Sequence, residues 1–145
     1  MRIAGCELCE GAGGRVLFEG AKLRVIHARE EGFPAFYRVV WSDHASEFSM
    51  LSASDRVSCM EAVALVEQCL REHLGPAKIN LASLGNVVAH MHWHVIARFQ
   101  DDGRFPAPVW APPSRERSPE REAAIESKLP ALEDDLVLRL SKGGF

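Results

Sequence analysis

The 145-residue sequence lacks any apolar run near the roughly 18 residues that a membrane-spanning helix needs. Its first residues also lack the apolar stretch of roughly 7–15 residues found in a signal peptide. We therefore expect a cytoplasmic protein with no membrane partner, and disulfides are rare in that compartment. The cysteines are accordingly expected to be thiols or metal ligands: Cys6, Cys9, Cys59 and Cys69.

An excess of basic residues is also absent. The formal net charge is −3 at pH 7, whereas nucleic-acid-binding proteins normally present a basic surface, so no nucleic-acid partner is expected. A small anionic ligand is still compatible with this charge, because a local site can be positive on an acidic protein. Hydrophobic residues make up 47% of the chain and charged residues 26%, which is typical of one globular domain with its own core.

One long helix is predicted from Ser52 to Leu74. Ser52 and Asp55 fit a capping box, which satisfies free amides of the first turn. Apolar residues then recur at helical spacing, and Gly75-Pro76 ends the pattern, since glycine accepts a left-handed cap and proline cannot continue a helix.

The remaining pattern predicts strands on both sides of this helix and a helical tail. Ser118-Pro119 is a good helix start, and residues 129–140 are expected to be helical with a restart at Pro130. This order of elements suggests an α+β fold with an antiparallel sheet. The expected strands cover residues 16–18, 23–26, 36–41, 78–81 and 91–99.

Three histidines alternate with apolar residues in the segment 90–94, HMHWH. Successive side chains of a strand point to opposite faces, so the three imidazoles should share one face at spacings of about 6.5–7 Å. Imidazoles are poor core material, because each has two nitrogens that need partners. The segment therefore indicates a functional site, and the alternating apolar residues Met91, Trp93 and Val95 are expected to pack against the long helix.

Two chemistries suit such a row of histidines. His-x-His on a strand can chelate zinc. Alternatively, a neutral imidazole can attack a phosphorus atom and form a covalent phosphoryl-histidine, and histidine suits this because its pKa near 6.5 leaves much of it neutral at pH 7. Alternation alone does not choose between them.

The segment from Lys78 to Phe99 resembles the signature of the histidine-triad (HIT) superfamily. It is similar in detail to the bacterial members described as diadenosine tetraphosphate hydrolase-like, which share the KINL run, the Gly-Asn turn and the tryptophan between the last two histidines. The segment 105–110, FPAPVW, is also typical of them, and the resemblance extends from about Cys6 to Trp110. It implies an antiparallel sheet of about five strands with one long helix, followed here by a C-terminal helical extension.

The resemblance also implies an activity. The protein would be a nucleotide hydrolase or transferase that cleaves the α-phosphate of a nucleoside polyphosphate, such as diadenosine tetraphosphate, or of a phosphoramidate, through a nucleotidyl-histidine. His92 would be the nucleophile, and His94 would bind phosphate oxygens and help to protonate the leaving group. The residues expected to contact substrate are Asn80, Asn86 and His27. His27 can equally be a polar residue at a strand end.

A second motif, the CxxC of Cys6 and Cys9, has the spacing of two zinc ligands. The strand–CxxC–helix context of a redox pair is missing. The resemblance implies that His44 and His90 complete a structural zinc site, which leaves His92 and the last triad histidine for chemistry. The alternative is free thiols without zinc. No organic cofactor is expected.

The resemblance divides the chain into a HIT domain at residues 1–110, beginning with a zinc-binding leader at 1–15, and a proline-rich linker with C-terminal helices at 111–145 that packs on the same domain. It also implies a homodimer. Two alternatives to an enzyme stay open: a nucleotide-binding sensor or scaffold with weak turnover, and a triad that serves purely as a metal centre.

Overall fold

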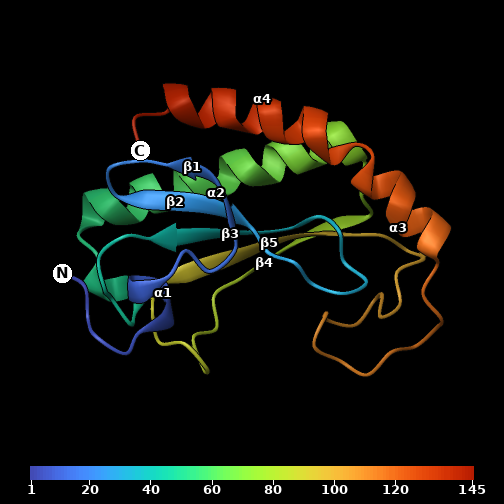
Figure 1. Cartoon of the computed structure of the whole chain (residues 1–145), viewed down its shortest axis with the longest axis horizontal. Coiled ribbons are helices and arrows are strands. Elements are labelled where there is room, and N and C mark those ends of the chain that lie inside the picture. Colours follow the sequence, from blue (N-terminus) through green and yellow to red (C-terminus); the bar gives the residue numbers. More distant parts are fainter.

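The computed structural model describes residues 1–145 and contains one five-stranded antiparallel sheet with helices packed on it (Figure 1). The strand order is β1-β2-β3-β5-β4, so β5 lies inside the sheet between β3 and the edge strand β4. This architecture confirms the predicted α+β class with about five antiparallel strands. The strands are β1 (Arg15–Glu19), β2 (Leu23–His27), β3 (Phe36–Trp41), β4 (Lys78–Ala82) and β5 (His92–Arg98).

The longest helix, α2 (Ala53–Leu74), crosses one face of the sheet (Figure 1). The Ser52 hydroxyl accepts a hydrogen bond from the Asp55 amide at 3.1 Å, which gives a partner to an amide that the first turn leaves free. Gly75 adopts φ 56°, the left-handed cap. Both predicted helix ends are therefore confirmed.

The C-terminal part forms two helices, α3 (Pro119–Glu126) and α4 (Leu129–Lys142). The Ser118 hydroxyl accepts from the Arg121 amide at 3.3 Å, and the chain restarts as a helix with Pro130 in the first turn of α4, as predicted. Helix α4 runs beside α2 above the sheet (Figure 1), and three of its side chains are fully buried: Leu132, Leu136 and Leu140. The short helices are α1 (Glu7–Glu10) and a 3-10 turn at Phe48–Met50. None of the helices combines the length and hydrophobicity of a bilayer span.

The two faces of the sheet have different roles. Tyr37 on β3 lies opposite Val95 on β5, and both side chains belong to the main core beneath α2. One position along, Arg38 lies opposite His94 on the other face. Because side chains alternate between the faces of a strand, these core residues lie on one face and these polar residues lie on the other. The apolar residues that alternate with the histidines pack on the helix-facing core, as predicted: Met91, Trp93 and Val95.

Strand β5 begins at His92, one residue later than expected. The amide of Met91 donates to the Ala45 carbonyl at 2.7 Å, and the Met91 carbonyl accepts from the Trp41 amide at 3.0 Å. Met91 is thus bonded to the last residue of β3 and to the chain that follows it, just before β5 begins. His90 therefore precedes the strand, and the direction of its side chain is not set by the alternation of side chains along β5.

The N-terminal leader, residues 1–14, packs on the face opposite α2, where Leu8 contacts a small cluster with Ile26 and Val40 (Figure 1). Gly14 permits this close approach, because a Cβ there would lie 2.6 Å from the His27 carbonyl oxygen. The buried Arg24 of β2 ties the leader down by donating to three of its carbonyls, at 2.8–3.0 Å: Leu8, Gly11 and Ala12.

Candidate active site

His92 and His94 lie side by side on the sheet face away from α2. Their ring centroids are 5.0 Å apart with nearly perpendicular planes, and both side chains are buried. They line a cavity of ≈ 560 Å³ together with Arg38, Trp110, the leader and the turn at residues 84–88. Small-molecule sites commonly have volumes of about 300–1,000 Å³, so the cavity is large enough for a small-molecule ligand.

The hydrogen bonds of His92 define which nitrogen is available. Its Nδ1 lies 2.6 Å from the backbone carbonyl oxygen of His90. Because a carbonyl only accepts, Nδ1 carries the proton, and Nε2 of the neutral ring keeps its lone pair. Burial lowers the pKa of His92, only partly opposed by this hydrogen bond, and the charge of Arg38 lowers it further. The neutral form with an unprotonated Nε2 is the form a nucleophile requires.

His94 has the opposite tautomer. Nε of Arg38 donates to His94 Nδ1 at 3.3 Å, so the proton of the neutral His94 ring is on Nε2. Burial lowers the pKa of His94 to about 4, with smaller contributions from His92 and Arg38. Neighbouring imidazoles thus present a lone pair and an N–H donor. That combination can attack a phosphorus atom and hydrogen-bond to the phosphate or its leaving group.

The other triad histidine, His90, turns toward the leader, where the four predicted metal ligands lie together. Its Nδ1 is 3.4 Å from Sγ of Cys6 and 3.5 Å from Sγ of Cys9, and Nδ1 of His44 is 3.5 Å from Sγ of Cys9. All four ligand atoms lie within 4.8 Å of one another. Tetrahedral zinc, with Zn–S near 2.3 Å and Zn–N near 2.0–2.1 Å, separates sulfur from nitrogen by about 3.5 Å. The donor set and its spacing fit zinc.

The surroundings of His90 support metal binding. Its Nε2 lies 2.6 Å from the Trp41 carbonyl oxygen, so Nε2 carries the proton and Nδ1 has the lone pair that faces the thiols. A backbone carbonyl that fixes the tautomer in this way is the usual partner of a metal-bound histidine. The triad is therefore divided: one histidine in the cysteine–histidine cluster and two in the cavity.

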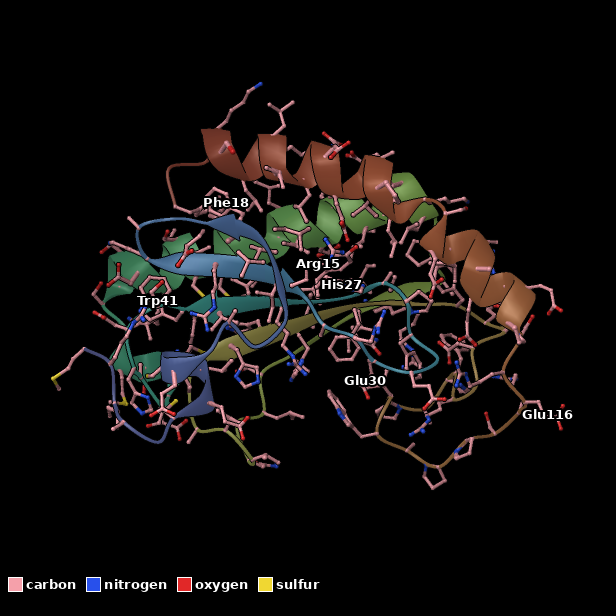
Figure 2. The ribbon with its side chains drawn as sticks, in the orientation of Figure 1. Arg15, Phe18, His27, Glu30, Trp41 and Glu116 are labelled. Atoms are coloured by element: carbon pink, nitrogen blue, oxygen red, sulfur yellow. The ribbon has the colours of Figure 1, made fainter.

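The three residues expected to bind substrate are in three different places. Asn86 lines the cavity with the two histidines. Asn80 does not line it, and its side-chain oxygen accepts a hydrogen bond from Arg98 at 2.9 Å. His27 lies at the end of β2 opposite Arg15 (Figure 2), lines a separate hollow of ≈ 450 Å³, and is bonded to the Pro34 carbonyl at 2.7 Å.

Sequence reasoning missed Arg38. It contacts His94 directly and is the only lysine or arginine that lines the cavity. One signal was available: β3 reads FYRVVW, and a charged residue inside an otherwise apolar strand is unusual. Trp110, the last residue of the segment FPAPVW, lies at the cavity with its ring 5.4 Å from that of His94.

An α+β fold that holds two histidines of a triad at a cavity, and the third in a separate ligand cluster, defines a histidine-triad protein. Residues 12–101 match the family model for the HIT domain. The chain belongs to the HIT family.

Solved structures agree with this assignment. A histidine triad protein from Marinobacter aquaeolei VT8 is 26% identical, with a TM-score of 0.70 over 94% of this chain and 99% of that chain. One from Sinorhizobium meliloti 1021 is 27% identical, with a TM-score of 0.70 over 89% and 93% of the two chains. One from Bradyrhizobium japonicum is similar in fold, with 23% identity and a TM-score of 0.68 over 87% and 92%. Among curated protein sequences, none matches this chain significantly.

Proposed function

We propose that the protein is a nucleotide hydrolase or transferase of the diadenosine tetraphosphate hydrolase-like kind, acting through a nucleotidyl-His92 intermediate. The observation that carries this proposal is the hydrogen bond of 2.6 Å from His92 Nδ1 to the His90 carbonyl, which leaves Nε2 free in the cavity. Membership of the HIT family, whose members bind nucleotides, supports it.

The reaction has two displacements at the same phosphorus. The lone pair of His92 Nε2 attacks the α-phosphorus, a P–N bond forms, and the P–O bond to the leaving group breaks with its electron pair on the leaving oxygen. Water then attacks, its oxygen forms the new P–O bond, and the P–N pair returns to Nε2. The products from diadenosine tetraphosphate are AMP and ATP, and the proton lost by water passes to solvent.

His94 assists as a hydrogen-bond donor. Its Nε2–H can bond to a phosphate oxygen or to the leaving oxygen, where negative charge increases in the transition state. The neutral state follows from the low pKa of His94, about 4. A donor that is uncharged at pH 7 stabilises the leaving oxygen without repelling Arg38.

The cluster of Cys6, Cys9, His44 and His90 is proposed to hold one structural zinc ion, with all four positions filled by protein. Such a zinc has no open position for water or substrate, so it contributes folding free energy and no step of the reaction. It would attach the leader to the chain that follows β3.

A homodimer and a cytoplasmic location belong to the same proposal. The edge strand β4 is unpaired on its outer side, and the exposed apolar side chains of the protein include Leu81 on this strand and Val57 on α2. An open strand edge beside apolar surface is suited to pairing with a second copy. Light scattering after gel filtration measures the assembly.

The enzyme proposal is tested by incubating the protein with diadenosine tetraphosphate and following AMP and ATP. Quenched samples should contain an acid-labile adenylyl adduct that is absent from His92→Asn. Products without an adduct would exclude the covalent route. Tight nucleotide binding with neither products nor adduct, across dinucleotides and adenosine phosphoramidates, would identify a sensor or scaffold instead.

A further inference from the structure

Arg38 occupies an unusual position for an arginine. It lies in the middle of β3, is half-buried, and lines the cavity beside His94. No other lysine or arginine lines this cavity, and Glu7 of the leader is its one acidic residue. The positive charge of the cavity wall is therefore concentrated at one side chain.

Most of the guanidinium of Arg38 has no partner in the protein. Its Nε donates to His94 Nδ1 at 3.3 Å, and this is its only hydrogen bond; no carboxylate lies within ion-pair distance of it. By contrast, Arg98 uses all three guanidinium nitrogens on Asp102 and Asn80. A guanidinium has five N–H donors, so both Nη groups of Arg38 remain available.

Burial without a counter-ion is unfavourable for a cation. Burial lowers the pKa of Arg38, and the carboxylate that partly offsets this effect is Glu30, which forms no ion pair with it. The ring of Phe36 lies 5.6 Å from the guanidinium carbon and supports it by a cation–π contact. An anion bound in the cavity would supply the missing partner.

The register of the sheet places this charge at the leaving-group side. Arg38 lies opposite His94, the proposed donor to the leaving oxygen, whereas His92 lies opposite Val40. We propose that the Nη groups of Arg38 bind the phosphate beyond the one that His92 attacks, so that the site prefers nucleoside polyphosphates to phosphoramidates. This inference rests on the proposed function.

The preference follows from charge. When the P–O bond of a polyphosphate breaks, the electron pair remains on a phosphate oxygen, and a guanidinium forms two parallel hydrogen bonds with such a group. The amine that leaves a phosphoramidate carries no negative charge after protonation. Arg38 would thus stabilise one leaving group and not the other, while its Nε holds the tautomer of His94 for both.

The test compares Arg38→Met with wild type on diadenosine tetraphosphate and on adenosine 5′-phosphoramidate. We expect the ratio of the two kcat/KM values to fall by about tenfold or more, the effect of a lost charged hydrogen bond. Arg29→Met is the control, because Arg29 is exposed and lines the separate hollow with His27; it removes the same charge and should leave the ratio unchanged. An unchanged ratio in folded Arg38→Met would overturn the inference.

Calorimetric binding gives a readout without turnover. Wild type should bind ADP more tightly than AMP, and Arg38→Met should bind the two equally. Arg38→Lys keeps the charge and should retain part of the ADP preference even if the methionine variant does not fold. If wild type binds ADP and AMP with equal affinity, the inference about Arg38 is wrong and the proposed function is unaffected. Failure of wild type to bind or cleave any nucleotide contradicts the proposed function, and the inference with it.

Discussion

Nδ1 of His92 lies 2.6 Å from the backbone carbonyl oxygen of His90. His90 therefore serves two sites: its imidazole belongs to the cysteine–histidine cluster, and its carbonyl orients the proposed nucleophile. A displacement of His90 would be transmitted to the His92 ring through this hydrogen bond and through the short backbone link between the two residues. Loss of the metal is consequently expected to impair catalysis as well.

Loss of the metal should lower both stability and turnover. We expect His44→Ala, which changes a ligand outside the cavity, to abolish zinc binding and to reduce the free energy of unfolding by about 3 kcal/mol or more. That corresponds to a fall in Tm of about 6–12 °C. Metal content by mass spectrometry, calorimetric Tm and kcat are the measurements. Cys59→Ala, at a buried thiol outside the cluster, should keep its zinc. Zinc loss with unchanged Tm and kcat would disprove the structural role.

Replacing the nucleophile should remove activity and keep the fold. His92→Asn can still donate a hydrogen bond toward the His90 carbonyl but has no imidazole lone pair. We expect kcat to fall by at least about 10³-fold, as for other lost nucleophiles. Circular dichroism should be unchanged, and zinc should be retained. Residual turnover within tenfold of wild type would assign the attack to another group.

Stability should depend on pH through His94. Its pKa is about 4 in the folded protein against an ordinary value of 6.5, so the unfolded chain binds the proton first as the pH falls. The contribution of His94 to stability is therefore complete above pH 6.5, declines below it, and is lost as the pH passes through about 4. Denaturant unfolding of wild type and His94→Gln over this range measures the difference. Parallel pH profiles for the two proteins would refute the shift.

Two asparagines that were expected to contact substrate should behave differently. Asn80→Ala leaves the buried Arg98 without one acceptor, so we expect a stability loss of about 1–3 kcal/mol and a KM within about twofold of wild type. Asn86→Ala removes an amide from the cavity wall and should raise KM with a stability change below about 0.5 kcal/mol. Urea unfolding and initial rates distinguish them. A large rise in KM for Asn80→Ala, with none for Asn86→Ala, would assign the substrate contact to Asn80 instead.

Local features were predictable from the sequence because their causes are local. The cap at Ser52 and the left-handed Gly75 depend on a few neighbouring residues. The resemblance to the HIT family indicated four ligands at widely separated positions, and the structure brings Cys6, Cys9, His44 and His90 together.

Features that depend on strand pairing were not predictable. Arg38 meets His94 only because β3 pairs with β5, and 50 residues separate these strands in the chain. The pairing of β2 with β3 places His27 on the helix-facing side, opposite Tyr37. The hydrogen-bond partner of Asn80 is Arg98, which becomes its neighbour only through the pairing of β4 with β5. Side chains alternate between the two faces of a strand, but this alternation does not show which set faces the helices until the neighbouring strand is known.

The two cysteines of the leader flank Leu8, and Leu8 is part of the cavity wall. Arg24 also donates to carbonyls of the same segment. This part of the wall is therefore held in place by the thiols of Cys6 and Cys9 and by the Arg24 guanidinium. The position of this part of the cavity wall is thus set by side chains that do not themselves line the cavity.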